Sequence, residues 1–283
     1  MPERAVDMQE ERISARDFSR LRELVYEEAG INLSSEKRSM LEGRIRRRLK
    51  SLAIPSYEQY CKYLFSRSGR KQEICHLIDV VTTNKTDFFR EPRHFEFLVN
   101  TALPELSQHN RSLFFWSAGC STGEEPYTLA MVVREYAETH PGLEFRILAT
   151  DVCSTVLEKA SQAVYSCEAV QPVPAALKLK YLMRSRDPSV NRVRVVPELR
   201  RLIEFRRLNF MDRDYGVTEK ASAIFCRNVL IYFDRITQQR ILEQLTRYLV
   251  PDGYLFVGHS ETLHELNLPL QQIAPALYRR MHD

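Results

Sequence analysis

Apolar and polar positions near the N-terminus recur with the period of an α-helix. Leu21 and Val25 fall at helical spacing between Asp17, a typical N-cap residue, and Gly30, a typical helix stop. We therefore predict an amphipathic helix over residues 17–29, capped by Asp17.

A second helix, predicted for about residues 36–52, has an apolar stripe and a basic opposite side. Seven basic residues and one acid lie between Lys37 and Lys50, so this segment carries most of the excess charge in a chain of net charge +4. Helical periodicity also covers residues 57–81, which makes the first eighty residues all-helical. The apolar stripe is formed by Leu41, Ile45, Leu49 and Leu52, and the basic side by Arg44, Arg46, Arg47 and Lys50.

From residue 113 onward, compact apolar runs alternate with helical patterns. A charged, β-branched segment at 181–196 interrupts the alternation and predicts a small inserted hairpin or subdomain. Strands that alternate with helices are typical of an α/β domain with a parallel sheet covered on both faces. The predicted strands are 113–118, 145–150, 203–208, 223–226 and 254–258, the last after an Asp252-Gly253 turn, and the helices are 126–137, 154–164 and 234–249.

Composition and charge exclude several classes of protein. The chain is 44% hydrophobic and 28% charged, as in ordinary globular proteins, and it has no apolar run long enough to span a membrane. Because the N-terminus is charged, unlike a signal peptide, we expect a cytoplasmic protein that does not insert into membranes. No nucleic-acid motif accompanies the basic helix, so we expect no nucleic-acid partner.

Metal and disulfide chemistry are not indicated by the spacing of cysteine and histidine. The six cysteines include no C-x-x-C pair, and we expect them to be reduced and mostly buried. The seven histidines are scattered, and no H-E-x-x-H occurs. The sequence therefore predicts no metal site.

The loop after the first predicted strand, SAGCSTGEEPY (117–127), carries the most chemical information. Its glycines lie between the end of a strand and the start of a helix, where open α/β sheets bind ligands. Read as G-x-S-x-G, the loop predicts a serine hydrolase with Ser121 as nucleophile and with Asp212 and His259 downstream in the required order.

A second interpretation makes the same loop a cofactor turn, with Gly119 allowing close approach and Asp151 binding ribose hydroxyls. The dinucleotide fingerprint G-x-G-x-x-G is absent, and the adjacent Glu124 and Glu125 would repel a pyrophosphate. This pair favours S-adenosylmethionine, which carries an ammonium and a sulfonium but no phosphate. The structural alternatives are a tight turn with a solvated glutamate pair, and Asp151 as a helix N-cap.

Five segments together resemble the CheR-type chemotaxis receptor glutamate O-methyltransferases, over about residues 13–281. Several separate motifs in the order of the family make the resemblance specific. The segments are TTNKTDFFRE (82–91), AGCSTGEEPYTLA (118–130), ATD (149–151), FCRNVLIYF (225–233) and PDGYLFVGHSE (251–261).

The resemblance implies a helical domain over residues 1–80, an interdomain linker over 81–95 that contributes to the cofactor site, and a Rossmann-like methyltransferase domain over 96–283. A small β-subdomain is expected at about 178–200. S-adenosylmethionine would be the methyl donor, leaving S-adenosylhomocysteine. Glutamate side chains on the cytoplasmic signalling helices of chemoreceptors would be the acceptors, and we expect a monomer. A receptor adaptor without catalysis is the non-enzyme alternative.

For this reaction, Arg90 and Tyr232 are our candidates for orienting the acceptor carboxylate. We expect the basic side of the 36–52 helix to attract a receptor helix bundle rich in glutamate. Without the resemblance, Arg90 reads as a surface charge and Tyr232 as a core aromatic. The residues implied at the cofactor are Asn84, Thr86, Arg90, Gly119, Glu124, Glu125, Asp151, Asn209, Phe210 (where we expect leucine), Cys226, Arg227 and Asn228.

Overall fold

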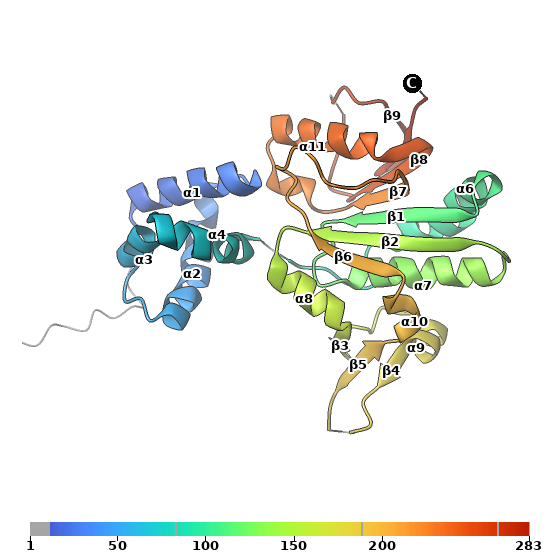
Figure 1. Ribbon diagram of the computed structural model, residues 1–283, viewed down its shortest axis with the longest axis horizontal. Helices are drawn as coiled ribbons and strands as arrows, with labels where there is room; N and C mark the ends of the chain where they lie inside the picture. The colour runs from blue at the N-terminus through green and yellow to red at the C-terminus, as the bar shows by residue number, and fades with distance from the viewer. Residues whose placement is uncertain (1–11, 83, 188, 265, 283) are drawn as a thin grey trace, which may run out of the picture. The chain divides into compact units, whose positions relative to one another are not determined.

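The computed structural model describes residues 12–82, 84–187, 189–264 and 266–282, and the chain divides into two compact units, Met1–Thr83 and Asn84–Asp283. The described part of the first unit is helical (Figure 1). Its elements are α1 (Ala15–Ala29), a 3₁₀ turn (Ser35–Lys37), α2 (Arg38–Leu52), α3 (Tyr57–Leu64) and α4 (Arg67–Val81).

Helix α1 begins earlier than its apolar pattern indicates. Ser14 is the N-cap residue, and its hydroxyl oxygen accepts a hydrogen bond from the Asp17 backbone N–H at 3.0 Å. The prediction that Asp17 caps the helix is therefore wrong, because Ser14 takes that role and Asp17 occupies the first turn. The predicted end is confirmed, since Gly30 adopts a left-handed φ of 70° there.

The basic side of α2 is only partly exposed. Arg44 donates hydrogen bonds to three carbonyl oxygens at the end of α4, those of Val80, Val81 and Thr82, and so caps that helix. Arg46 is half-buried, and its Nε donates to the Tyr57 hydroxyl at 3.3 Å. The prediction that all four basic residues project outward is thus wrong for these two arginines. The exposed members are Arg47 and Lys50.

The second unit is built on a seven-stranded sheet with the order β6-β2-β1-β7-β8-β10-β9 (Figure 1). The five strands from β6 to β8 are parallel, and β10 and β9 pair antiparallel at one edge. The strands are β1 (Ser112–Ala118), β2 (Glu144–Asp151), β6 (Ile203–Arg207), β7 (Ala221–Cys226), β8 (Leu249–Val257), β9 (Leu270–Ala274) and β10 (Leu277–Arg280).

Helices cover both faces of this sheet, which confirms the predicted α/β fold. Phe115 of β1 packs in the cluster that includes Leu129 of α7, whereas Trp116 packs with Leu242 of α11. All residues of β7 are buried, as expected for a central parallel strand. The helices are α5 (Pro92–Phe97), followed by a π-helical turn (Leu98–Ala102), α6 (Leu103–His109), α7 (Glu124–Glu138), α8 (Ser154–Gln162), α9 (Ala175–Tyr181), α10 (Pro197–Arg200) and α11 (Arg235–Arg247).

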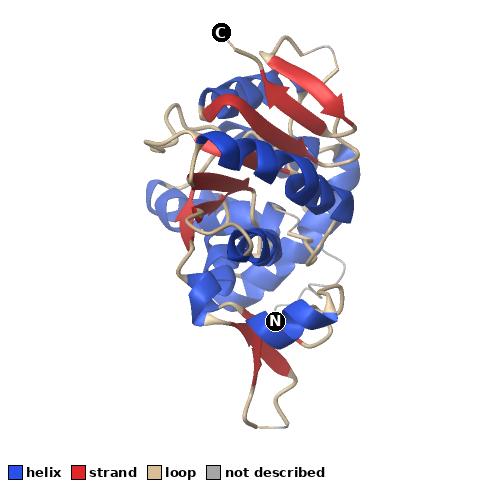
Figure 2. Cartoon of the chain, turned by 90° about the vertical axis from the view of Figure 1, so that its right-hand side faces the viewer, coloured by secondary structure: helices blue, strands red, loops and turns tan. Residues whose placement is uncertain are grey.

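A small antiparallel sheet interrupts the alternation where the sequence predicts an insertion. Its order is β3-β5-β4, and Figure 2 shows its hairpin loop extending away from the larger sheet. Helix α8 ends at Gln162 instead of Val164, because Val164 begins the first of these strands. The strands are β3 (Val164–Ser166), β4 (Leu182–Arg184) and β5 (Arg192–Val195).

The predicted Asp252-Gly253 turn lies inside a strand. β8 begins at Leu249, which is paired with Ala221, and after an irregularity in register Tyr254 pairs with Ala223. Asp252 adopts a φ of 60° at this irregularity. The two residues therefore form a bulge in β8, and the strand starts five residues earlier than its apolar run.

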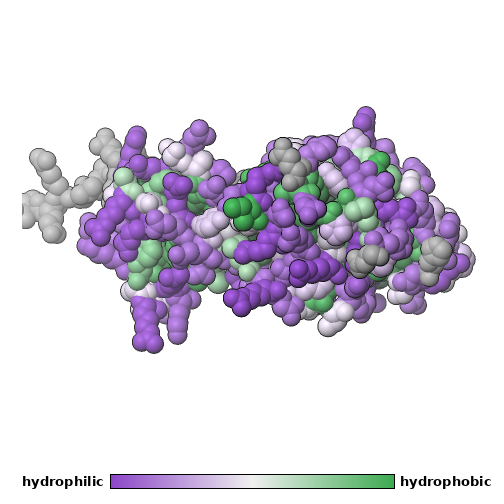
Figure 3. All heavy atoms as spheres, turned by 90° about the horizontal axis from the view of Figure 1, so that it is seen from above, coloured by the Kyte–Doolittle hydropathy of each residue, from purple (hydrophilic) through white to green (hydrophobic). Residues whose placement is uncertain are grey.

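Within the described ranges, no helix is both long and apolar enough to cross a bilayer. The surface in Figure 3 is mainly hydrophilic, and its apolar residues form small separate patches.

Candidate functional site

The loop that follows β1 lies at the point where the strand order of the sheet reverses. β2 follows β1 in the chain and pairs on one side of it, and β7 pairs on the other. Ligands of open α/β sheets bind outside the carboxyl ends of the strands at such a point. The backbone N–H groups of Gly119 and Cys120 both donate to the carbonyl oxygen of Thr150, at 2.8 and 2.9 Å, which holds the loop against the end of β2.

Gly119 is required by its backbone conformation and by its neighbour. Its φ is +92°, and a Cβ atom would lie 2.4 Å from Cγ2 of Val229. Gly142 has a similar φ of +82° but no atom within 4 Å of the corresponding position, so it is a matched control.

We expect Gly119→Ala to be more destabilising than Gly142→Ala. The left-handed conformation alone costs about 1–2 kcal/mol at either position, and the overlap with Val229 adds about 1–3 kcal/mol at Gly119. Urea unfolding of both variants measures the difference. Equal losses in the free energy of unfolding would show that the contact with Val229 relaxes without cost.

Asp151 ends β2 and is held rigidly beside the loop. It is 9% exposed, and its two carboxylate oxygens accept the backbone N–H groups of Ser121 and Cys153, each at 2.9 Å. The N-cap position of α8 is occupied by Cys153, which argues against the N-cap alternative for Asp151. These two bonds fix the orientation of the Asp151 carboxylate, a group that accepts hydrogen bonds, at the carboxyl end of β2.

The glutamate pair of the loop is not solvated. Glu124 is buried and accepts a hydrogen bond from the Thr122 hydroxyl at 2.6 Å. Glu125 accepts the Ser117 hydroxyl at 2.6 Å and lies 3.2 Å from Nη1 of Arg227. Burial raises the pKa of both carboxyl groups. The alternative of a tight turn with exposed glutamates is therefore wrong.

Arg227 joins this loop to a residue that the sequence did not single out. Its side chain is 2% exposed and contacts Glu91 at 3.0 Å, Glu125 at 3.2 Å and the carbonyl oxygen of Arg90. Glu91 also accepts the His259 backbone N–H at 3.2 Å and the Asn228 side-chain amide at 3.4 Å. Although burial opposes ionisation, the Arg227 guanidinium and the His259 N–H lower the pKa of Glu91. The sequence feature that could have identified Glu91 is its position beside Arg90 in the 82–91 motif.

A second missed carboxylate, Glu261, connects the turns after β7 and β8. It is buried and accepts the backbone N–H groups of Asn228 at 2.8 Å, Gly258 at 2.6 Å and Ile231 at 3.3 Å. Asn228 adopts a φ of 59° within the turn. Glu261 therefore fixes the Cys226-Arg227-Asn228 turn, where Cys226 is the buried last residue of β7.

The segment before α5 contacts the loop and the start of α8 through Asn84. The carbonyl oxygen of Asn84 accepts the Ser121 hydroxyl at 2.9 Å, and the Asn84 amide lies 3.7 Å from the sulfur of Cys153. Thr86 and Arg90 are half-buried in this segment, and the Arg90 guanidinium donates to the Lys85 carbonyl oxygen at 3.0 Å.

The remaining predicted residues lie after β6 and β7. The backbone N–H of Leu208 donates to the Asp151 carbonyl oxygen at 3.0 Å, so Asn209 and Phe210 follow beside the end of β2. The Phe210 ring packs against Tyr215 and Phe233. Tyr232 is half-buried in a 3₁₀ turn, Leu230–Tyr232.

The hydrolase interpretation is not supported. The Ser121 hydroxyl donates to the Asn84 carbonyl oxygen, and the Asp212 carboxylate accepts the Asn209 backbone N–H at 3.4 Å. The His259 ring lies against His94, with the ring centroids 4.9 Å apart. The three residues therefore have separate partners and do not form a catalytic triad.

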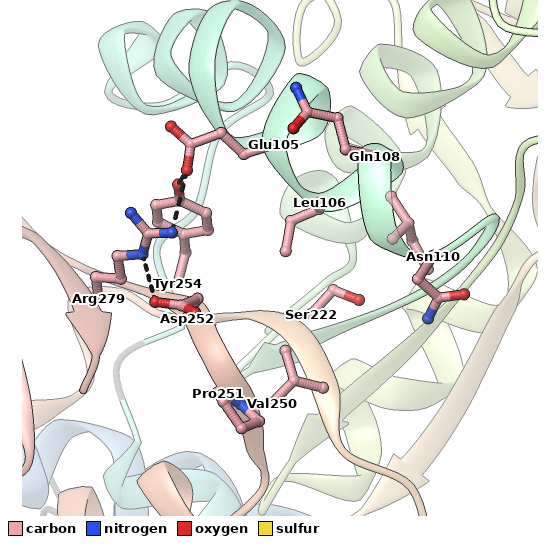
Figure 4. Close-up of a pocket in the computed structure, with 11 residues that line it drawn as sticks. Glu105, Leu106, Gln108, Asn110, Ser222, Val250, Pro251, Asp252, Tyr254 and Arg279 are labelled. Carbon is pink, nitrogen blue, oxygen red and sulfur yellow. Dashed lines mark hydrogen bonds and ion pairs between the residues drawn. The ribbon is translucent and has the colours of Figure 1, made fainter. Parts of the chain in front are cut away.

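A pocket of about 560 Å³ lies at the other end of the strands, near the amino ends of the parallel strands (Figure 4). Its cation, Arg279, contacts Asp252 at 3.1 Å and Glu105 at 3.4 Å, so two carboxylates already neutralise it. The lining residues are Glu105, Leu106, Gln108, Asn110, Leu113, Ser222, Val250, Pro251, Asp252, Tyr254 and Arg279.

The open sheet, the glycine loop at its reversal point, the fixed acid at the end of the second strand and the lack of a pyrophosphate fingerprint are consistent with a Rossmann-like methyltransferase. Residues 84–277 match the family model of the CheR methyltransferase SAM binding domain, and residues 16–82 match that of the CheR methyltransferase all-alpha domain. The chain belongs to the CheR methyltransferase family, which confirms the resemblance, the enzyme class and S-adenosylmethionine as cofactor.

Several relatives are similar along nearly their whole length. The chemotaxis protein methyltransferase of Borreliella burgdorferi is 40% identical over 275 residues, covering 95% of each chain. Chemotaxis protein methyltransferase 2 of Pseudomonas aeruginosa is 38% identical, also covering 95% of each chain. The chemotaxis protein methyltransferase of Escherichia coli K12 is 40% identical, covering 90% of this chain and 88% of the relative.

The side chains at this edge fit S-adenosylmethionine. The fixed Asp151 carboxylate suits ribose hydroxyls, and the half-buried carboxylates of Glu91 and Glu125 outnumber the one buried guanidinium between them. An excess of carboxylate suits a ligand with cationic groups and disfavours a phosphate.

Proposed function

We propose that this protein transfers methyl groups from S-adenosylmethionine to glutamate side chains on the cytoplasmic helices of chemoreceptors. The proposal is carried by the fixed Asp151 carboxylate beside the Gly119 loop, in a chain whose relatives are named chemotaxis protein methyltransferases. We place this activity in the cytoplasm, where those helices are found.

The acceptor needs little activation. A glutamate carboxylate has a reference pKa of about 4.3 and is ionised at neutral pH, so no general base is required. S-adenosylmethionine supplies a methyl group on a positively charged sulfur. The protein must bind both partners, align the carboxylate with the methyl group and exclude water.

The turn that contains Arg227 and Asn228 is held in one conformation by carboxylates. Two carboxylates contact the Arg227 side chain, and Asn228 donates hydrogen bonds to Glu91 and Glu261. In our proposal this turn holds the cofactor with Asp151, and Arg90 and Tyr232 orient the acceptor. Asn84, Thr86, Gly119, Glu124, Glu125, Asn209, Phe210 and Cys226 complete the proposed cofactor site.

The exposed part of α2 provides a surface for an acidic partner. Arg47 and Lys50 are exposed, whereas Arg44 and Arg46 are half-buried and hydrogen-bonded within the helical unit. A receptor helix that presents glutamates is attracted to such a surface over a distance set by the ionic strength. We therefore propose Arg47 and Lys50 as the receptor-binding residues of α2.

Reversing both charges, Arg47→Glu with Lys50→Glu, is expected to lower kcat/KM for a receptor fragment about tenfold or more at low salt. The affinity for S-adenosylhomocysteine should stay unchanged. The matched control is Arg67→Glu with Lys71→Glu, which reverses two exposed charges on α4. Equal losses in both double variants would assign the effect to net charge, and loss of cofactor affinity would indicate misfolding.

An experiment with one receptor fragment separates this function from the adaptor alternative. Binding of the fragment is measured by sedimentation, and transfer of a labelled methyl group is measured in the same samples. The proposal predicts both. Binding without transfer, by protein that binds S-adenosylmethionine, would support an adaptor.

A further inference from the structure

Three side chains with metal-binding atoms meet beside the network of Arg227. Glu91 is the N-cap residue of α5, His94 lies in that helix, and His259 follows β8. One carboxylate oxygen and one nitrogen from each imidazole lie within 4.8 Å of one another. The chain positions are up to 168 residues apart, so the sequence gives no spacing that would reveal this cluster.

His94 is the unusual member of the cluster. Its side chain is 1% exposed, and neither ring nitrogen has a hydrogen-bond partner among the described residues. Nδ1 lies 3.4 Å from a carboxylate oxygen of Glu91. Buried polar atoms are nearly always hydrogen-bonded, and a bound ion is one of the few explanations for an exception.

We propose that Glu91, His94 and His259 form a binding site for a divalent transition-metal ion of the Zn²⁺ class. Two imidazoles and one carboxylate with an open fourth position are a typical zinc ligand set. Imidazole nitrogen favours Zn²⁺, Co²⁺ and Ni²⁺ over Mg²⁺ and Ca²⁺. His259 is exposed and gives the ion a route from solvent.

The positive charge of Arg227 opposes the binding of a metal ion between Glu91, His94 and His259. Arg227 contacts Glu91 at 3.0 Å, but it also contacts Glu125 at 3.2 Å. Glu91 can therefore turn toward a metal ion while Arg227 keeps a carboxylate partner.

The test is a titration of the tag-free, chelator-treated full chain with Co²⁺, followed by visible absorption. We expect one Co²⁺ to bind per chain. The visible absorption bands should be those of a four- or five-coordinate ion with nitrogen and oxygen ligands, and added Zn²⁺ should abolish these bands by displacing Co²⁺. The spectrum should lack the sulfur charge-transfer band that binding at exposed Cys75 would produce. His259→Ala should weaken binding at least about tenfold, since even changes in residues that only support metal ligands cost about 10–100-fold.

Two further variants make the outcome decisive. His94→Ala should lose affinity like His259→Ala, and its folding is checked by circular dichroism because the residue is buried. His264→Ala is the matched control, an exposed histidine on the same loop outside the cluster, and should bind as the wild type does. No Co²⁺ binding, unchanged affinity in His259→Ala, or an equal loss in His264→Ala would overturn the proposal.

Discussion

Arg90→Ala is expected to lower the rate constant for methyl transfer by about 10²-fold or more, because misplacement of a reacting group by about 1 Å has an effect of this size. The side chain is half-buried and directed by its hydrogen bond to the Lys85 carbonyl oxygen. The substitution leaves the Arg90 carbonyl oxygen, which accepts from Arg227, in place. It therefore tests the guanidinium alone. Single-turnover kinetics with a receptor fragment measure the rate.

Two controls show whether the loss belongs to the orientation of the acceptor. Arg93→Ala removes an exposed arginine three residues further on and should leave the rate unchanged. Arg90→Lys keeps the charge but not the planar group, and we expect it to recover only part of the rate. Near-normal methylation by Arg90→Ala would refute the proposed role.

Asp151→Ala is expected to abolish detectable binding of S-adenosylmethionine and S-adenosylhomocysteine in a calorimetric titration. The change removes the proposed acceptor for the ribose hydroxyls. It also releases the loop, since the Ser121 and Cys153 N–H groups lose their partner at a cost of about 1–3 kcal/mol each. Thermal unfolding of the same samples therefore accompanies the titration.

The matched control for Asp151 is Asp187→Ala. Asp187 also accepts a backbone N–H, that of Ser189 at 2.9 Å, but it lies in the exposed hairpin loop of the small sheet. This variant should bind the cofactor as the wild type does. Wild-type affinity in folded Asp151→Ala would show that Asp151 is only a turn residue.

The sheet could be predicted because its central strands are buried on both faces. Such strands read as continuous apolar runs, as in the Ala223 to Cys226 part of β7, and the helices between them keep a 3.6-residue period. Element ends were less predictable, because a single side chain decides them. Ser14 caps α1 through one hydrogen bond, and the bulge at Asp252 hides the first half of β8.

The site could be predicted only where its residues lie in local motifs. Gly119 directly follows β1 and Asp151 is the last residue of β2, so the alternation of strands and helices places both at the carboxyl ends of the strands. Glu91 and Arg227 are 136 residues apart, and only the order of the strands brings them together. Arg44 was misplaced for the same reason, since its partners at the end of α4 lie 36 to 38 residues away.

The measurement that tests the central claim most directly is to map the methylated residues of a receptor cytoplasmic fragment by mass spectrometry. The fragment is incubated with this protein and labelled S-adenosylmethionine, and half of the product is treated with alkali. We predict methyl groups on glutamate residues only, released by alkali as methanol, as expected of carboxyl esters. Alkali-stable methylation of lysine, or no transfer by protein that binds the cofactor, would contradict the account.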